Sequence, residues 1–156
     1  MTTPYEATLK VPQPGEAAPK FMAPSWPAGT ISLDDFIGHK NVILAFYPKD
    51  MTPGCTKEMC NFSCDLAHFS NVDTQVIGIS CDRIKSHEEF TKQFDLKIPL
   101  IADEDAAICK SYGVTREGAL LANRVTFIID KQGIVQEVIE GMPNNAELLS
   151  LIQQLK

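Results

Sequence analysis

The sequence predicts an α/β protein, a three-layer α/β/α sandwich around a mixed central sheet. Apolar runs of strand length alternate with segments of helical period along most of the chain, and such alternation places parallel strands in one sheet with helices on its faces. Near the C-terminus, runs 125–130 and 134–139 flank a Lys-Gln-Gly turn, which predicts an antiparallel hairpin. The 156 residues, 44% of them hydrophobic, suffice for a single domain, which we expect to span residues 1–156.

The N-terminal third is expected to hold an irregular arm and then the first buried strand. Residues 1–30 are rich in Pro, Gly and Ala and show no period, so we predict an extended N-terminal arm with short strand pieces. Ser and Asp within 30–36 suit the start of a short helix. The continuous apolar run 41–47 predicts a buried central strand. Turn-forming residues fill 48–55, and a helical pattern begins at Thr56.

The middle of the chain is predicted to continue with a helix, a strand and a second helix. The first helix has apolar residues three or four positions apart, which are Met59, Phe62, Leu66 and Phe69. The run 74–80 predicts the next strand. Ser86 and Glu89 have the spacing of a capping box, so we expect a helix that opens at Ser86 and continues to about Phe94.

The remaining elements are short. A strand is predicted at 99–102, followed by a helix over 105–112 that Gly113 ends. After the hairpin, Asn144 or Asn145 is expected to cap a last helix. The apolar face of that helix comprises Leu148, Leu149, Ile152 and Leu155.

Composition excludes several functional classes. Lys and Arg number 14 against 20 Asp and Glu, a net charge of −6, which argues against nucleic-acid or anionic-membrane binding. No apolar run is long enough to span a bilayer, and the N-terminus lacks the basic and apolar regions of a secretory signal. Five cysteines in such a chain suggest free thiols in a reducing compartment, and we expect a cytoplasmic protein.

Cys55 stands out because it follows a turn and occupies the first turn of a predicted helix. The first N–H groups of a helix lack internal partners and carry partial positive charge, and cysteines there have a lowered pKa and react as thiolates. Pro53 suits the first helical position, and Gly54 allows close backbone approach. Thr52 offers a hydroxyl beside the sulfur, and Pro48 would wall the pocket. The alternative is a buried structural thiol.

These residues carry a family resemblance. The pattern Pro48-x-x-x-Thr52-x-x-Cys55 resembles the active-site signature of the peroxiredoxins, and the string over 46–60 resembles their bacterioferritin-comigratory, or Q-type, branch. Three later blocks are similar to family blocks in the expected order: Gly78-Ile-Ser-Cys-Asp82, Asp103 followed by Tyr112-Gly-Val, and Arg124-Val-Thr-Phe-Ile-Ile-Asp130. The resemblance covers roughly residues 30–156.

The resemblance implies a thioredoxin-like fold and the reduction of hydrogen peroxide and organic hydroperoxides. Cys55 would be the peroxidatic cysteine, and Thr52 would orient the peroxide and contact the thiolate. Pro48 would shield the sulfur. Arg124 would keep Cys55 ionised and stabilise the charge that develops on the leaving oxygen. The alternative for Arg124 is an ordinary solvated strand end.

By the same resemblance Cys60 is the resolving cysteine, which condenses with the sulfenic acid of Cys55 to a disulfide. In an intact helix their Cα atoms would be about 8.7 Å apart, beyond the limit of about 7 Å for a disulfide, so we expect the first turns to unwind. Cys64 remains an alternative resolver, because the text after Cys60 departs from the family's x-Phe-Arg-Asp. Cys81 and Cys109 are expected to be buried small residues.

Two other functions compete with a peroxidase. Cys60, Cys64 and His68 could belong to a zinc site, but their i, i+4, i+8 spacing spans about 12 Å of helix axis, too far for one ion. A thiol–disulfide oxidoreductase usually carries C-x-x-C, whereas here the spacing is C-x4-C.

The partners follow from the peroxidase interpretation. No organic cofactor or metal is implied, because sulfur carries the chemistry. The resemblance suggests recycling by thioredoxin or a similar dithiol, and a monomer or weak dimer.

Overall fold

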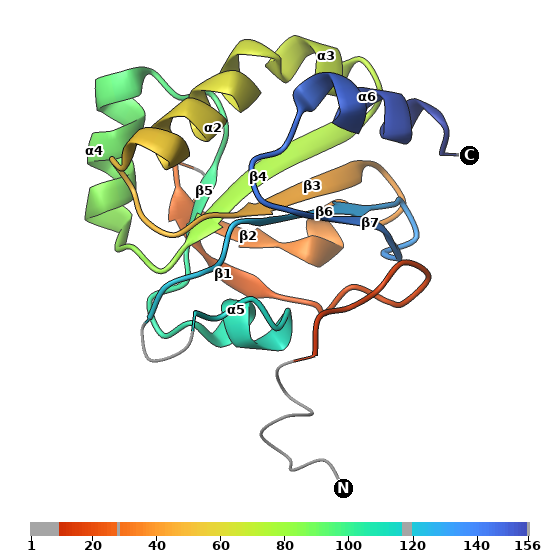
Figure 1. Ribbon diagram of the computed structural model, residues 1–156, viewed down its shortest axis with the longest axis horizontal. Helices are drawn as coiled ribbons and strands as arrows, with labels where there is room; N and C mark the ends of the chain where they lie inside the picture. The colour runs from red at the N-terminus through yellow and green to blue at the C-terminus, as the bar shows by residue number, and fades with distance from the viewer. Residues whose placement is uncertain (1–9, 28, 117–119, 156) are drawn as a thin grey trace, which may run out of the picture.

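The computed structural model describes residues 10–27, 29–116 and 120–155. Seven strands form one sheet in the order β2-β1-β5-β4-β3-β6-β7 (Figure 1). The strands are β1 (Met22–Trp26), β2 (Gly29–Ser32), β3 (Asn41–Phe46), β4 (Thr74–Ser80), β5 (Leu100–Ala102), β6 (Val125–Ile129) and β7 (Val135–Glu140). The helices are the 3-10 helix η1 (Leu33–Asp35), α2 (Pro53–Cys64), α3 (Leu66–Ser70), α4 (Ile84–Phe94), α5 (Ala107–Ser111) and α6 (Asn145–Gln153).

The sheet is mixed, as predicted. Strands β3, β4 and β5 run parallel, because helical crossovers connect them. The hairpin β6–β7 lies on one side of this parallel core, with β6 antiparallel to β3. On the other side β1 pairs antiparallel with β5 and with β2. The strand pieces expected in the N-terminal arm therefore extend the same sheet.

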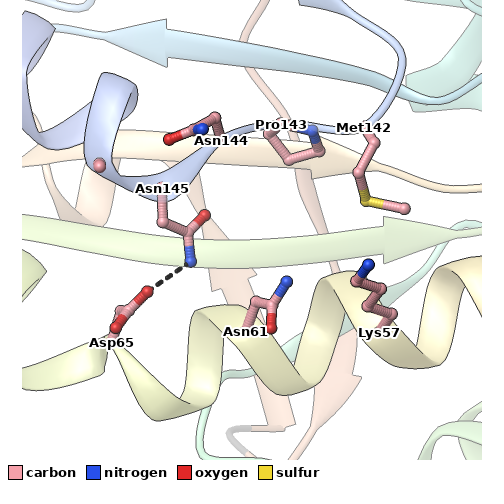
Figure 2. A pocket seen from close by; sticks show the side chains of 8 residues that line it. Lys57, Asn61, Asp65, Met142, Pro143, Asn144 and Asn145 are labelled. Atoms are coloured by element: carbon pink, nitrogen blue, oxygen red, sulfur yellow. Dashed lines mark hydrogen bonds between the residues drawn. The ribbon is translucent and has the colours of Figure 1, made fainter.

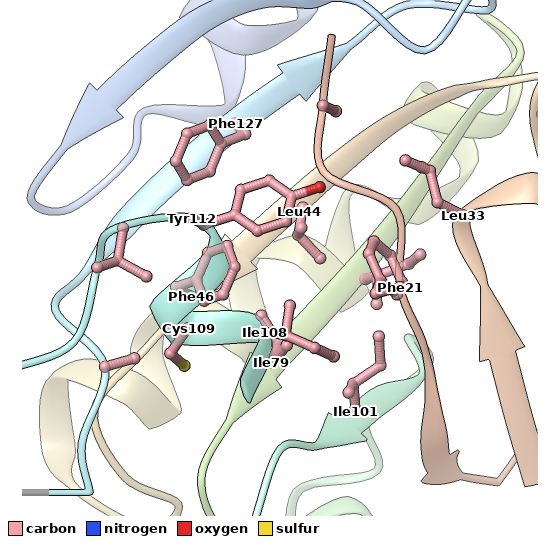
Figure 3. Packing of buried hydrophobic residues seen from close by; sticks show 14 of the residues in the cluster. Phe21, Leu33, Leu44, Phe46, Ile79, Ile101, Ile108, Cys109, Tyr112 and Phe127 are labelled. Carbon is pink, nitrogen blue, oxygen red and sulfur yellow. The ribbon is translucent and has the colours of Figure 1, made fainter. Parts of the chain in front are cut away.

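Helices cover both faces of the sheet and complete three layers (Figure 1). On one face a buried cluster joins the sheet to α2, α3, α4 and α6. On the other, a second cluster packs the sheet against α5, η1 and the segment that precedes β1 (Figure 3). Aromatic rings of Phe46, Tyr112 and Phe127 lie at the centre of this second cluster, with ring centroids between 5.1 and 5.7 Å apart. The predicted α/β sandwich is confirmed.

Close contact between α2 and the sheet depends on Gly78 in β4. A Cβ added there would lie 2.7 Å from a methyl carbon of Leu100 and 3.0 Å from the sulfur of Met59. Distances this short are rare for real Cβ atoms, so the side chains of Leu100 and Met59 would have to shift to make room for a larger residue at position 78.

Two local predictions are wrong. The helical period through Met59 and Phe69 is not one helix, because α2 ends at Cys64 and α3 starts at Leu66. Ser86 does not cap a helix: α4 begins at Ile84, and the Ser86 hydroxyl donates to Asp50 at 2.7 Å. The Ser86 hydroxyl therefore donates to a distant carboxylate instead of accepting a backbone N–H group of its own helix, as the sequence pattern suggested.

The other helix ends follow the predicted chemistry. A capping box with both reciprocal bonds starts η1 at Ser32. Asn144 caps α6 by accepting the N–H of Glu147 at 3.1 Å. Helix α5 is shorter than predicted, and Gly113 follows its end with φ of +67°. Among the described residues no helix is long and apolar enough to cross a membrane.

Candidate active site

Cys55 lies in the first turn of α2, at the edge of the sheet where the parallel strands end. Strand β3 ends at Phe46, and a short loop leads to Thr52, whose backbone is extended and whose carbonyl oxygen accepts the N–H of Thr56 at 2.9 Å. Pro53 occupies the first helical position, as predicted, because its ring fixes the required φ and its missing N–H is not needed there. The Cys55 side chain is completely buried.

Arg124 contacts the Cys55 sulfur. Its Nη2 donates a hydrogen bond to Sγ at 3.4 Å. The register of β6 on β3 explains this proximity, because Val125 is opposite Phe46 and Arg124 therefore lies beside the start of the active-site loop. The predicted pairing of Cys55 with Arg124 thus has a physical basis in strand pairing, and the alternative of a solvated strand end does not hold.

Gly54 makes room for this guanidinium. A Cβ added at Gly54 would lie 3.0 Å from Nη2 of Arg124 and 3.9 Å from the terminal methyl of Met142. The sequence suggested that Gly54 permits a close approach, and the structure shows that the approaching group is the Arg124 side chain.

Glu58 was missed in the sequence. It is buried, one turn after Cys55, and forms an ion pair with Nη1 of Arg124. Burial raises the pKa of Glu58 to about 7, although the bond and the charge of Arg124 act in the opposite direction. Its Oε2 has no hydrogen-bond partner among the described residues. The available signal was an acidic residue three positions after a nucleophile candidate, on the same helical face.

The Arg124 guanidinium therefore binds two partners at once. Nη1 contacts Glu58 and Nη2 contacts Cys55. Burial lowers the pKa of Arg124, but its bonds to Glu58 and Cys55 outweigh that effect and raise the pKa overall. The planar fork of arginine suits this task, because its N–H groups are fixed relative to one another.

Thr52 and Pro48 lie in the loop before α2. The Thr52 hydroxyl donates its hydrogen bond to the carbonyl oxygen of Lys49 at 2.9 Å. Its oxygen can still accept a hydrogen bond from another group. Pro48 is half-buried and lies two residues after the end of β3. Met51, between them in sequence, adopts φ of +70°, a left-handed conformation that costs energy for a side chain of this kind.

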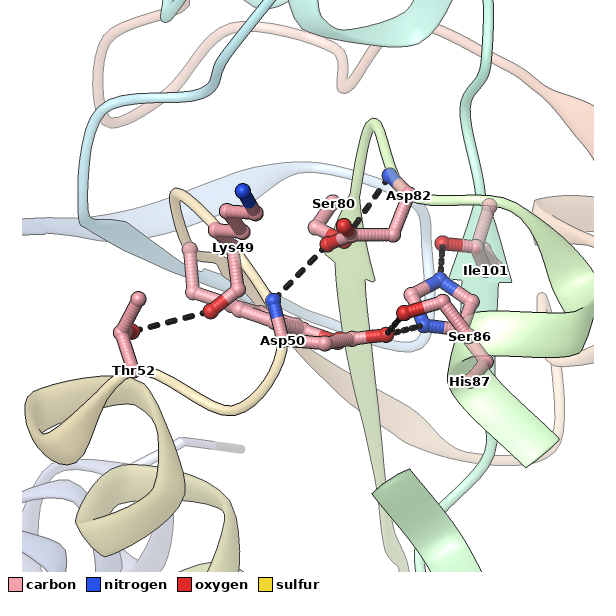
Figure 4. A network of polar contacts seen from close by, with 9 residues as sticks. Lys49, Asp50, Thr52, Ser80, Asp82, Ser86, His87 and Ile101 are labelled. Atoms are coloured by element: carbon pink, nitrogen blue, oxygen red, sulfur yellow. Dashed lines mark hydrogen bonds and ion pairs between the residues drawn. The ribbon is translucent and has the colours of Figure 1, made fainter. Parts of the chain in front are cut away.

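A buried polar network holds this loop (Figure 4). The Asp50 carboxylate accepts hydrogen bonds of 2.7 Å from the hydroxyl groups of Tyr47, directly after β3, and Ser86 of α4, and it lies 2.7 Å from Nδ1 of His87. The Asp50 N–H donates to Asp82 at 2.9 Å. Asp50 therefore ties the active-site loop both to α4 and to the end of β4.

His87 of α4 links the Asp50 carboxylate to the backbone of β5. Its Nε2 lies 2.9 Å from the carbonyl oxygen of Ile101. Nδ1 faces the Asp50 carboxylate, and both side chains are buried. Neither Asp50 nor His87 was singled out in the sequence, because their contact joins positions that are 37 residues apart.

The two candidate resolving thiols lie further along α2. Cys60 is half-buried and Cys64 is exposed, and the five cysteines of the chain are all free. Both thiols line a hollow of about 360 Å³ together with Ser63 and with Phe94, Asp95 and Lys97 at the end of α4. Burial, and then the nearby Cys64, raise the pKa of Cys60. Cys55 is not among the residues that line this hollow.

A second hollow, of about 470 Å³, separates α2 from the segment that leads into α6 (Figure 2). Lys57 and Asn61 point into it from α2, and Met142 from the opposite side. Asn145 donates to Asp65 at 2.9 Å and closes one end.

The zinc set considered from the sequence is not assembled. Cys60 and Cys64 belong to α2, whereas His68 lies on α3, beyond the break at Asp65. Among the described residues, the side chains that gather their Cys, His or carboxylate atoms within 4.8 Å of one another form two other groups, one of which is the Asp50 network.

Comparison with known proteins gives consistent results. The model of the AhpC/TSA family matches residues 14–138. A Coxiella burnetii protein described as a peroxiredoxin of the bcp type is 42% identical over 130 residues, covering 80% of this chain and 85% of the relative.

Solved structures with a similar fold come from proteins of the same kind. Peroxidoxin BcpB from Mycobacterium tuberculosis superimposes with a TM-score of 0.86 at 28% identity, covering 93% of this chain and 99% of the other. A mutant of PrxQ from Xylella fastidiosa gives a TM-score of 0.85 at 27% identity, covering 92% and 97%.

Proposed function

The chain belongs to the AhpC/TSA family and is a peroxiredoxin, a thiol peroxidase with a thioredoxin-like fold, and on that premise we propose that Cys55 is its peroxidatic cysteine and Cys60 its resolving cysteine. The observation that carries the first assignment is the bond of 3.4 Å from Arg124 to the buried Cys55 sulfur at a helix N-terminus. Helix and guanidinium both present positive charge to a thiolate.

In the first step the Cys55 thiolate attacks one oxygen of the peroxide. An S–O bond forms and the O–O bond breaks, so Cys55 becomes a sulfenic acid and the second oxygen leaves with a proton as water or an alcohol. Arg124 stabilises the charge on the reacting atoms, because its Nη2 already faces the Cys55 sulfur. Thr52 orients the peroxide: its hydroxyl donates to Lys49, so its free lone pairs accept the peroxide O–H.

Glu58 acts through Arg124 and is a positioning residue. It holds Nη1, which leaves Nη2 to face the sulfur. Pro48, at the end of β3, limits the access of water to the same sulfur.

In the second step the Cys60 thiol attacks the sulfenic sulfur. The S–S bond forms, the S–O bond breaks and water leaves. Both cysteines lie within one continuous helix in the reduced form, where their Cα separation of about 8.7 Å forbids a disulfide. The first turns of α2 therefore unwind in each cycle.

The third step needs an external dithiol, which we propose is thioredoxin or a similar protein. Cys60 and Cys64 line the same surface hollow, so the sulfur that the reductant attacks lies near the surface. Because the disulfide must be reduced again after every turnover, we propose a reducing, cytoplasmic location. We propose a monomer or weak dimer.

Thioredoxin-coupled peroxide turnover tests these roles with three variants. Cys55→Ser should abolish turnover. Cys60→Ser should consume one equivalent of peroxide and then stop, because the sulfenic acid has no resolving partner. Cys64→Ser should keep recycling. If Cys64→Ser alone stops recycling, Cys64 is the resolving cysteine, while the peroxidase assignment of Cys55 stands.

Peptide mapping of the oxidised protein distinguishes the two resolvers directly. Trypsin leaves Cys55 in peptide 50–57 and places Cys60 and Cys64 together in 58–83. A second digestion with chymotrypsin at Phe62 separates them. A link from 50–57 to the part that ends at Phe62 supports Cys60, and a link to the part that starts at residue 63 contradicts it.

A further inference from the structure

Two cysteines outside the active site lie next to each other. The sulfur atoms of Cys81 and Cys109 are 3.8 Å apart, although 28 residues separate them in the chain. Cys81 directly follows β4, and Cys109 lies within α5, the helix that follows β5. Because β4 and β5 are parallel neighbours, the segments after them meet at the same edge of the sheet.

This pair is on the opposite face of the sheet from Cys55. Cys109 is fully buried in the cluster beneath α5 (Figure 3). Cys81 is partly buried and packs against that cluster. Cys55 belongs to the cluster beneath α2. The sheet therefore separates the two sets of thiols, and Cys55 does not reach the pair in the folded state.

We propose that Cys81 and Cys109 form a second redox-active dithiol, which hydrogen peroxide oxidises to an intramolecular disulfide independently of Cys55. The partly exposed Cys81 thiolate attacks the peroxide, its S–O bond forms, the O–O bond breaks and water leaves. The Cys109 thiol then attacks the Cys81 sulfur, the S–S bond forms, and the second oxygen leaves as water. Two thiols and one peroxide give one disulfide and two waters.

The shared hydrogen bond assigns the two roles. The hydrogen bond shared with Cys109 lowers the pKa of Cys81, against the opposing effects of burial and of nearby carboxylates. The same bond, and then burial, raise the pKa of Cys109. Cys81 is therefore the more acidic thiol of the pair and also the one that solvent reaches, so it is the partner that reacts first with peroxide.

Disulfide formation requires a small movement. The S–S bond measures about 2.05 Å, so the two sulfurs must approach by about 1.8 Å. Cys109 is held in place because its N–H donates to Asp103 at 2.8 Å and the N–H of Ile108 donates to the same carboxylate at 3.1 Å. Cys81 lies in the bend between β4 and α4, and we expect this side to move.

A metal ion is the competing occupant. Asp103 also lies within 4.8 Å of the two sulfurs, but both of its oxygens already accept backbone N–H groups of α5. Two thiols and a carboxylate engaged in this way fall short of the four ligands of a structural zinc site. The geometry therefore favours a dithiol.

The test uses the triple variant Cys55→Ser, Cys60→Ser, Cys64→Ser, which retains only Cys81 and Cys109. After exposure to hydrogen peroxide in native buffer, we expect the loss of both titratable thiols and a mass lower by two hydrogen atoms, reversed by dithiothreitol. In this variant the tryptic peptide 58–83 carries only Cys81, so its disulfide link to 98–110 identifies the pair. In the wild type, the same link appears after chymotrypsin separates residues 60 and 64 from Cys81, which keeps the test valid if the triple variant folds poorly.

Two further variants make the outcome decisive. Adding Cys109→Ser should leave a Cys81 sulfenic acid that dimedone traps, and adding Cys81→Ser should leave Cys109 unreactive while the protein is folded. The proposal is overturned if both thiols persist at peroxide concentrations that oxidise Cys55 in the wild type, or if Cys81 is oxidised without the disulfide. It is also overturned if the triple variant retains one equivalent of zinc that Cys81→Ser releases.

Discussion

Arg124 donates a hydrogen bond of 3.4 Å to the sulfur of Cys55, although 69 residues separate the two in sequence. The other arm of the same guanidinium binds the buried Glu58. This arrangement makes Arg124 the residue that links strand β6 to the start of α2, and it leads to predictions about rate, stability and pH.

Removing the guanidinium should slow the oxidation of Cys55. We expect Arg124→Met to lower the second-order rate constant with hydrogen peroxide roughly 100-fold, the usual effect of losing one preorganised donor. Arg124→Lys should recover only part of the rate, because one ammonium cannot reproduce the planar fork. Single-turnover oxidation measures this. Arg83→Met, which removes an exposed cation paired with Glu104, is the control, and equal rates in all four proteins would contradict the prediction.

Gly54→Ala should act through Arg124. The new Cβ would lie 3.0 Å from Nη2, so the guanidinium must shift, and we expect roughly a tenfold loss of rate with little change in stability. A double-mutant cycle gives the sharper measurement. In the Arg124→Met background, Gly54→Ala should have no further effect; an additive loss would mean that the substitution acts elsewhere.

Glu58 should make stability depend on pH. Burial raises its pKa from 4.5 to about 7 in the folded state, so the folded protein binds more protons than the unfolded chain between these values. The free energy of unfolding therefore receives a contribution that is full below about pH 4.5 and is lost as pH rises through about 7.

Urea unfolding at several pH values checks the effect of Glu58. Glu58→Gln should flatten the decline in stability across this window. Glu89→Gln removes an exposed carboxyl group from α4 and should leave the slope as in the wild type. An unchanged slope in Glu58→Gln would show that Glu58 does not titrate there.

The Asp50 network should dominate the stability of the active-site loop. Asp50→Ala leaves His87 and two hydroxyl groups without their buried partner, and breaking a buried pair in this way costs about 3–5 kcal/mol. Asp34→Ala, which removes an exposed pair with Lys20, should cost less than about 1 kcal/mol. Chemical denaturation measures both, and similar losses in the two variants would refute a special role for Asp50.

Oxidation should reduce helix content. Because a Cys55–Cys60 disulfide does not fit an intact α2, the far-ultraviolet circular dichroism of the disulfide form should show less helix than that of the dithiol form. Cys60→Ser treated with one equivalent of peroxide is the control, since it forms the sulfenic acid without the link. Identical spectra for the dithiol and disulfide forms would rule out unwinding.

The sequence by itself was sufficient for the elements that depend on local patterns. Runs such as 41–47 and 74–80 are continuous apolar segments, and Cys55 is marked by the turn and the helix around it. The capping of α6 by Asn144 also rests on neighbouring residues. Such features are encoded within a few positions, so periodicity and spacing reveal them.

Tertiary structure decided everything that depends on strand pairing. The register of Val125 on Phe46 brings Arg124 to Cys55, and the buried Asp50 takes Ser86 away from its predicted capping role. The parallel pairing of β4 and β5 sets Cys81 beside Cys109, where the sequence suggested only two packing residues. The contact of Arg124 with Cys55 joins residues 69 positions apart and that of Cys81 with Cys109 joins residues 28 positions apart. No local pattern records them, because the register of a sheet is set by the packing of the whole core.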